Sequence, residues 1–338
     1  MSGALRTLAL TCCAAAACAA FAADAHEAPP PQRSVAQWLT RLQQAQDVPA
    51  YAGIFVVSSA AGGMSSARIW HVCEGGLPVE RAEALTGAPR LTYRHGQRVA
   101  VFWPGKRLVR LQERETHLPF PARLPTLAGS GTAPDDYYEA QLEAPQRVAG
   151  FEADVLWLRP RDAWRYGYRI WSERHTGLII QAQTLDAQGR VLEQGGFSEL
   201  QLAAPATAAE MLRAMKGTEG WQVERTPRQS VDALTEGWRL HQQVPGFVPL
   251  NFYVRPHSHA AAMAQWIVSD GLATVSLFIE PPDGQPRTAA VGASSHGATH
   301  ALSGSVQDAA GHAWRVTAVG EAPPHTLQAL MQSLERVR

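Results

Sequence analysis

Apolar positions near the start of the chain recur at helical spacing. The residues from 26 to 33 are rich in proline, and Ser34 then precedes a regular run of apolar side chains. Serine is a favoured residue just before the first turn of a helix, because its hydroxyl accepts a main-chain N–H. The pattern therefore predicts an amphipathic helix that buries one face. That face consists of Val35, Trp38, Leu39, Leu42 and Ala45.

From Tyr51 onward, apolar and polar residues alternate, which is the period of β-strands. Short turns containing Gly or Pro separate the runs, so successive strands are expected to pair antiparallel. Residues 113–136 are rich in Pro, Gly, Thr and Ser and are expected to form a long loop. The expected strands are 51–58, 68–74, 90–94, 98–103, 107–112 and 154–158.

Residues 165–202 predict three further strands joined by two tight turns. Tyr166, Tyr168 and Ile170 occupy every second position, which is the period of a β-strand. The dipeptide at 176–177 closes the first turn and the segment 186–189 closes the second, each with a glycine that tolerates positive φ. The stretch is thus an aromatic-rich antiparallel meander that carries no obvious catalytic group.

The second half of the chain predicts a small α+β unit. Thr207 and Glu210 form a capping-box pattern for a helix that ends at Gly217. Residues 217–236 are polar and are interpreted as an irregular linker, and residues 281–297 as a loop. The expected strands are 237–242, 250–254, 264–269, 274–279, 300–307 and 312–319. A last helix is expected to begin at the prolines 323 and 324 and to bury Leu327, Leu330, Met331, Leu334 and Val337.

The beginning of the chain has the features of an export signal. Arg6 precedes an apolar run at 8–21, and residues 20–22 or 23–25 fit a small-residue cleavage site. The run is shorter than a membrane span, so a soluble protein exported to the periplasm is expected after removal of residues 1–25. The alternative is lipidation of Cys18, but alanine stands where leucine is preferred, three residues earlier.

Composition narrows the function further. A length of 338 residues suits two domains, and 30 basic residues balance 30 acidic ones, so nothing favours nucleic acid as a partner. Only Lys106 and Lys216 are lysines, a bias that a GC-rich genome explains. Cys73 is the single cysteine that remains after the signal. A buried, inert thiol is expected there, and a reactive or intermolecular thiol is the alternative.

A search for catalytic and metal-binding motifs finds none, so we expect no enzyme, no cofactor and no metal site. The spacing of His257 and His259 would place both imidazoles on one face of a strand, as two metal ligands require. No third potential metal ligand lies at a convincing spacing from them. The acidic pair at 135–136 is interpreted as a solvated turn. Ser294, Ser295 and His296 are sequence neighbours, and such neighbours rarely form a catalytic triad.

Several motifs together resemble the RseB/MucB family. They are RYxYxxW from Arg165, LDxxGxxLEQ from Leu185, VPGF at 244–247, SDGL at 269–272 and VGEAPP at 319–324. The resemblance spans most of the mature chain in the family's order. It implies a periplasmic negative regulator of the envelope-stress sigma factor, which holds the periplasmic region of an RseA/MucA-like anti-sigma factor. It also implies protection of that region from regulated proteolysis, and release by lipid or lipopolysaccharide fragments.

The resemblance also implies a fold. Residues 26–205 would form an unclosed antiparallel β-barrel with helices, similar to LolA and LolB, that senses lipid. Residues 206–236 would be a linker, and 237–338 a small α+β domain that binds the partner. A filled core is the alternative to a lipid cavity, a LolA/LolB-type carrier is the alternative function, and self-association stays open. The residues compatible with a lipid cavity are Phe55, Trp70, Phe102, Trp103, Trp157 and Ile170.

Overall fold

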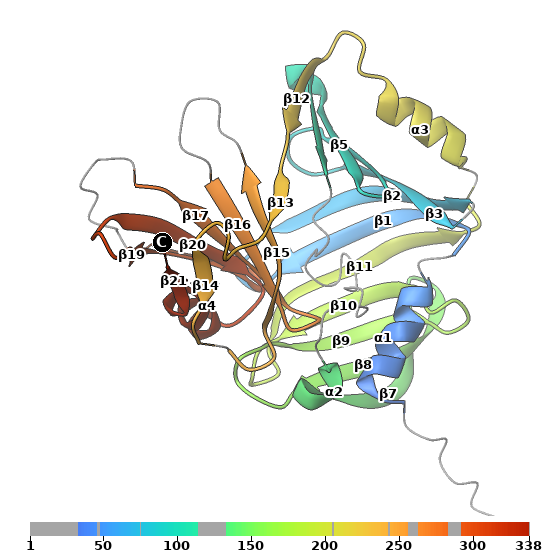
Figure 1. The fold of residues 1–338 in the computed structure, drawn as a ribbon. Helices are drawn as coiled ribbons and strands as arrows, with labels where there is room; N and C mark the ends of the chain where they lie inside the picture. Colours follow the sequence, from blue (N-terminus) through green and yellow to red (C-terminus); the bar gives the residue numbers. More distant parts are fainter. Residues whose placement is uncertain are drawn as a thin grey trace, which may run out of the picture. The chain divides into compact units, whose positions relative to one another are not determined.

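The computed structural model describes residues 33–45, 48–74, 76–113, 133–204, 206–242, 244–255, 263–282 and 292–337. Three sheets and four helices make up these residues (Figure 1). The helices are α1 (Val35–Gln44), α2 (Pro134–Tyr137), α3 (Ala208–Lys216) and α4 (Pro324–Gln332). Among the residues described, no helix combines the length and apolar character that crossing a membrane requires. The predicted export signal at 1–25 lies outside the described residues.

The largest sheet has 12 strands and is open. Its order runs from β12 at one edge to β7 at the other, and all neighbours pair antiparallel except β12 and β6, which are parallel. The predicted unclosed antiparallel sheet is therefore confirmed. In sheet order the strands are β12 (Gln222–Thr226), β6 (Leu108–Glu113), β5 (Arg98–Trp103), β4 (Leu91–His95), β3 (Leu77–Ala84), β2 (Met64–Glu74), β1 (Ala50–Ser59), β11 (Val191–Leu202), β10 (Ile179–Leu185), β9 (Gly167–Glu173), β8 (Phe151–Pro160) and β7 (Tyr138–Val148).

A second sheet of seven strands forms most of the C-terminal half, and a two-stranded ribbon lies beside α4. The seven strands are, in order, β13 (Gln229–Val231), β15 (Val248–Arg255), β16 (Met263–Ser269), β17 (Thr274–Glu280), β20 (Ala313–Gly320), β19 (Thr299–Gln307) and β18 (Ala293–His296). The ribbon pairs β14 (Trp238–Leu240) with β21 (Leu334–Arg336). The predicted mainly-β fold with an α+β second half is thus confirmed.

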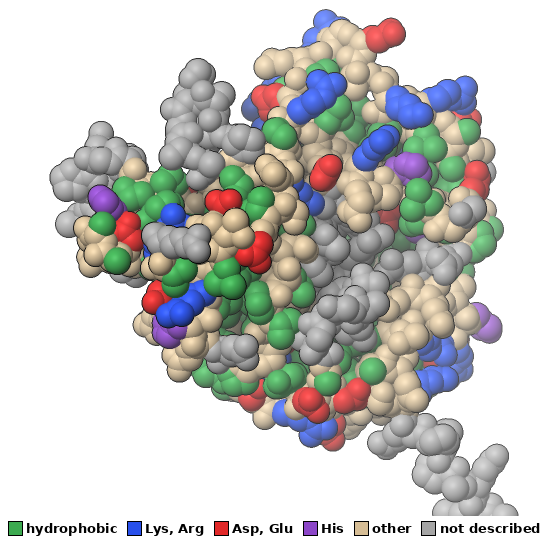
Figure 2. All heavy atoms as spheres, viewed as in Figure 1, with side chains coloured by type: hydrophobic (Ala, Val, Ile, Leu, Met, Phe, Trp, Pro, Cys, Tyr) green, Lys and Arg blue, Asp and Glu red, His purple; other side chains and the backbone are tan. Residues whose placement is uncertain are grey.

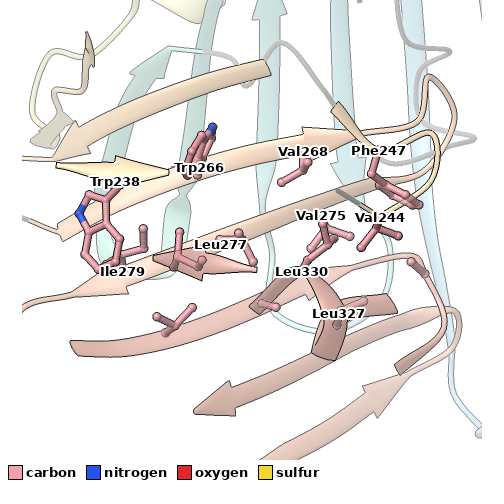
Figure 3. Close-up of a cluster of buried hydrophobic side chains, with 14 of the residues drawn as sticks. Trp238, Val244, Phe247, Trp266, Val268, Val275, Leu277, Ile279, Leu327 and Leu330 are labelled. Atoms are coloured by element: carbon pink, nitrogen blue, oxygen red, sulfur yellow. The ribbon is translucent and has the colours of Figure 1, made fainter. Parts of the chain in front are cut away.

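Each sheet buries its own apolar core. In the C-terminal half, Trp238, Trp266 and Leu277 pack with Leu327 and Leu330 of α4, so this helix covers the sheet through its apolar face (Figure 3). In the N-terminal half, the predicted face of α1 is buried, with Leu39 at 1% exposure. It packs on Leu156 and Ile170 of the large sheet. Burial of each such side chain stabilises the fold by about 1.5–3 kcal/mol. The two clusters therefore hold α4 and α1 against their sheets.

Several expectations from the sequence are wrong in detail. Strands β3 and β7 form where none was expected, and β18 forms within the expected loop at 281–297. The segment 217–236 is not irregular, since β12 pairs with the first sheet and β13 with the second. The last helix ends at Gln332, so Leu334 belongs to β21 instead of the helix. Cys73 is half-buried rather than buried.

The pair at 135–136 also differs from the solvated turn that we expected. The Asp135 carboxylate accepts the main-chain N–H of Val35 at 2.7 Å and that of Ala36 at 3.3 Å. These N–H groups belong to the first turn of α1, which has no acidic residue of its own there. Asp135 therefore caps α1 from a distant part of the sequence and opposes the positive end of the helix dipole.

We predict that Asp135→Ala lowers the free energy of unfolding by about 1–2 kcal/mol, the usual effect of losing a helix cap. Urea denaturation followed by circular dichroism measures this change. Asp136→Ala is the matched control, because Asp136 is exposed on the same short helix. An equal change for both variants would contradict the capping role.

Candidate functional site

The motifs that carry the family resemblance meet around one buried arginine. Arg165 lies just before β9, and its side chain is fully buried. Its Nη1 donates to Asp270 at 2.7 Å, and its Nε donates to Asp162 at 2.9 Å. Its Nη2 donates to the carbonyl oxygen of Pro245. Three sequence motifs, at 165–171, 244–247 and 269–272, therefore contribute to a single junction between the two halves.

Asp270 is held by the turn between β16 and β17. Its Oδ1 accepts the main-chain N–H groups of Leu272 and Ala273, and its Oδ2 accepts the hydroxyl of Tyr138 at 2.8 Å. Burial raises the pKa of Asp270, while Arg165 and these N–H donors oppose that shift. Burial and the nearby carboxylate raise the pKa of Tyr138, so its hydroxyl stays protonated and donates. Complete hydrogen bonding is the condition under which a charge pair tolerates burial.

Aromatic rings and a glycine shape the space around the guanidinium. The Cζ of Arg165 lies 4.5 Å from the ring centre of Tyr137 and 5.3 Å from that of Phe247. Gly246 has φ +78°, and a Cβ there would lie 2.9 Å from Arg165 and from Tyr137. The VPGF motif thus needs glycine at this position both for its backbone conformation and for its close approach.

Apolar contacts also cross between the halves. Leu272, next to the Asp270 turn, is fully buried within the same cluster as Leu39 of α1 and Ile170 of β9. In the other direction, Trp164 packs against the C-terminal core, and its carbonyl accepts the Thr326 hydroxyl at 2.8 Å. Each half therefore places a side chain in or against the core of the other, which makes the junction a packed interface.

A second acidic group lies at the same junction, in the VGEAPP motif. Glu321 is only 6% exposed, and its Oε2 has no hydrogen-bond partner among the described residues. Burial, with a smaller contribution from the charge of Glu193, raises the pKa of Glu321 to about 8. Glu193 belongs to β11, and burial raises its pKa as well. Nearby, the Tyr166 hydroxyl and His300 Nε2 are 2.9 Å apart.

The six residues predicted for a lipid cavity do not gather in one place. Ile170 lies in the α1 cluster, and Phe55 contacts Phe197 at 5.1 Å between ring centres in another cluster. Trp70 and Phe102 belong to two further clusters. Trp157 and Trp103 are half-buried beneath arginines, with Arg159 3.8 Å from the Trp157 ring centre. The lipid cavity stays a prediction.

The remaining candidate groups show no catalytic arrangement in the part of the chain that the structure describes. His257 and His259 lie outside it, and no cluster of three metal-ligating side chains occurs within it. Ser294, Ser295 and His296 all lie exposed on β18. Positive and negative side chains are interspersed over the visible face, which offers no field of a single sign (Figure 2).

Sequence reasoning used the motifs as a family signature but missed that they form one junction. Arg165 and Asp270 are 105 positions apart, and neither local period nor spacing joins them. The available signal was their chemistry: a conspicuous arginine and aspartate stood in otherwise apolar motifs, where a charge requires a partner.

Two family models match the chain. The model of the MucB/RseB N-terminal domain matches residues 34–215, and that of the C-terminal domain matches residues 232–335. The chain belongs to the MucB/RseB family. A curated relative, the sigma factor AlgU regulatory protein MucB of Pseudomonas aeruginosa, is 33% identical over 303 residues, which cover 88% of this chain and 89% of the relative. The sigma-E factor regulatory protein RseB of Haemophilus influenzae is 27% identical over 48% of this chain and 50% of its own length.

Solved MucB structures have the same fold. The crystal structure of MucB in complex with MucA(peri) superposes with a TM-score of 0.67 at 27% identity, over 90% of this chain and 99% of that one. The crystal structure of MucB described without a partner superposes with a TM-score of 0.60 at 26% identity, over 89% and 97% of the two chains. Both halves of the MucB/RseB fold are thus present here.

We predict that Arg165→Met lowers the free energy of unfolding by about 3–5 kcal/mol, because it leaves the Asp270 carboxylate buried without its charge partner. Chemical denaturation measures the loss. Arg169→Met is the control, since Arg169 is partly exposed and pairs with Glu143 near the surface, where such pairs contribute about 0–1 kcal/mol. Similar losses in both variants would contradict the importance of the junction.

We also predict that stability falls as pH rises from about 4.5 to about 8. Across this window Glu321 stays protonated in the folded chain and ionises in the unfolded chain, so folding takes up a proton. Glu193 adds a slope of the same sign, because its pKa is also raised, whereas the pKa of His300, which burial lowers, gives a slope of the opposite sign. Glu321→Gln should flatten the profile measured by urea denaturation at several pH values. An unchanged slope in this variant would contradict the assignment.

Proposed function

We propose that this chain is a periplasmic regulatory protein that binds the periplasmic region of a membrane anti-sigma factor of the RseA/MucA type. The observation that carries the proposal is the similarity to MucB in its complex with MucA(peri), which extends along both halves of the chain. Membership of the MucB/RseB family supports the same role. The periplasmic location rests on that role and on the export signal expected at 1–25.

The proposal includes protection of the bound partner from proteolysis and release by lipid or lipopolysaccharide. A ligand releases a partner only if it prefers an arrangement of the protein that the partner does not. The junction around Arg165 provides an element on which such a preference can act, because it joins both halves through buried polar contacts. Linkage then requires that partner and lipid weaken each other's binding equally.

We assign lipid sensing to residues 26–205 and partner binding chiefly to residues 237–338, with residues 206–236 as the connection. The open 12-stranded sheet supports this assignment, since eleven of its strands lie within residues 50–202. A carrier of the LolA/LolB type is the second function considered. The match of the MucB/RseB C-terminal model to residues 232–335 favours the regulator.

We predict that the chain from residue 26 binds the MucA(peri) segment seen in the crystal structure with MucB with micromolar or tighter affinity in isothermal titration calorimetry. Saturating lipid A should weaken this binding severalfold. A scrambled MucA(peri) sequence is the control for nonspecific association. Absence of binding would overturn the partner assignment, whereas binding that lipid A leaves unchanged would overturn only the release by lipid.

A further inference from the structure

A carboxyl group with an unbonded oxygen is buried where the C-terminal sheet ends at the junction. Glu321 directly follows Gly320, the last residue of β20, which lies opposite Val275 of β17. In this antiparallel register the next position on β17 is Thr274. Glu321 Oε2 and Thr274 Oγ1 are both buried, and neither has a hydrogen-bond partner among the described residues. This place therefore tolerates a neutral carboxyl group better than a carboxylate, which requires donors.

A second carboxyl group reaches this place from the first half. Glu193 of β11 accepts the main-chain N–H of Ala298, in the turn between β18 and β19. Gly297 precedes Ala298 with φ +61°, and a Cβ there would collide with the Glu193 carboxylate, so this close approach needs glycine. Burial, and then the charge of Glu193, raise the pKa of Glu321 to about 8. Two carboxyl groups from different halves are thus close enough to interact, which favours a proton on one of them.

The neighbouring side chains keep their charge near neutral pH. Burial raises the pKa of Tyr168 on β9 well above its usual value, and the charge of Glu321 adds to this shift. Burial also raises the pKa of Tyr166 to about 12 and lowers that of His300, whose Nε2 is 2.9 Å from the Tyr166 hydroxyl. The charged groups nearby are His296 beside Glu193, Asp186 beside Tyr166, and the pair of Arg165 with Asp270. The proton of Glu321 therefore decides which charge is buried here.

We propose that Glu321 and the turn between β18 and β19 form a proton-dependent latch between the two halves. The latch is closed while the Glu321 carboxyl group carries its proton, and ionisation opens it, because water must then reach the carboxylate. Opening separates the turn from β11 and breaks the hydrogen bond between Ala298 and Glu193. The halves stay joined at Arg165, where Nε, Nη1 and Nη2 each donate to an acceptor.

The direction of the response follows from linkage. The pKa of Glu321 is raised in the closed arrangement and returns toward its ordinary value, 4.5, once water reaches the group. The closed arrangement is therefore favoured at low pH and is lost as pH rises toward 8. One proton changes the opening equilibrium about tenfold per pH unit within this window. Below its ordinary pKa of 6.5, His300 acts in the opposite direction, so the response is clearest between about pH 6.5 and 8.

The latch is a property of the chain itself and does not depend on the proposed function. Any ligand that prefers one of the two arrangements would take up or release a proton when it binds. Local opening also differs from global unfolding, because it exposes only the amides at the turn and little new surface. Exchange through local opening is therefore insensitive to low concentrations of urea, whereas exchange through global unfolding accelerates.

Hydrogen exchange of the chain from residue 26, resolved to single amides by NMR, tests the latch. The reporter is the Ala298 N–H, and the comparison amides are those of Ile267 and Val268, which are equally buried in the central strand β16. Corrected for the intrinsic exchange rate, the protection of Ala298 should be lower than theirs, should fall on the order of tenfold from pH 6.5 to 8, and should not respond to low urea. A pH-independent protection of Ala298, or the same protection and urea response as Ile267, would overturn the latch.

Two variants assign the response to its group. Glu321→Gln keeps the size of the side chain but cannot ionise, so the protection of Ala298 should lose its pH dependence. Glu193→Gln keeps an acceptor for Ala298 and removes the neighbouring charge, so the response should remain and move to lower pH. Glu139→Gln is the matched control, because Glu139 is exposed on β7, and it should behave as the unchanged chain. A full response in folded Glu321→Gln would overturn the role of Glu321, and the unchanged chain alone decides the latch where a variant does not fold.

Discussion

A charged guanidinium is buried between two sheets, and the surrounding structure has to satisfy it. Taking Arg165 out of water is costly unless its donors find acceptors. Asp162 comes from its own half, but Asp270 and the Pro245 carbonyl come from the other. Neither half alone can complete the set. The turn of Asp270, the glycine at 246 and the position of Tyr138 all follow from this requirement.

The junction changes how a signal would pass between the halves. A polar linker at 217–236 would have left them free to move, but β12 and β13 attach that segment to both sheets. Any rearrangement must therefore break buried contacts worth several kcal/mol. A ligand supplies that energy only through its differential affinity for the two arrangements. Two carboxyl groups, the buried Glu321 and the half-buried Glu193, make the same interface sensitive to their protonation.

The parts of the fold that sequence predicts best are those with strong local patterns. The capped helix after Ser34 and the aromatic meander with Gly177 at its turn form as expected. Strand β7 lies at a sheet edge and is mostly exposed, so it lacks alternation. Strand β3 is partly buried along nearly its whole length and contains Pro78, which again hides the period of two. Whether such a segment forms a strand depends on the neighbouring strands with which it pairs. A short stretch of sequence does not contain those neighbours.

The candidate site was less accessible to sequence than the fold. Aromatic composition indicates burial, but Trp70, Phe102 and Ile170 enter different clusters because burial alone does not specify neighbours. The junction depends on contacts between distant residues, such as Arg165 with Pro245 and Asp270, which are 80 and 105 positions away. Such features arise only when the tertiary structure has formed.

The parallel pairing of β12 with β6 has a consequence for how the chain assembles. All other neighbours in the large sheet are complete once residue 202 has been synthesised, yet the edge beside β6 is covered only by residues 222–226. Until then β6 presents an open edge, which is a hazard for association with other chains. Arg110 of β6 pairs with Glu224, and Trp221 packs edge-on to Phe102 at 5.0 Å. The segment that leads into the second half is thus also the last component of the first, and any boundary drawn before it divides a sheet.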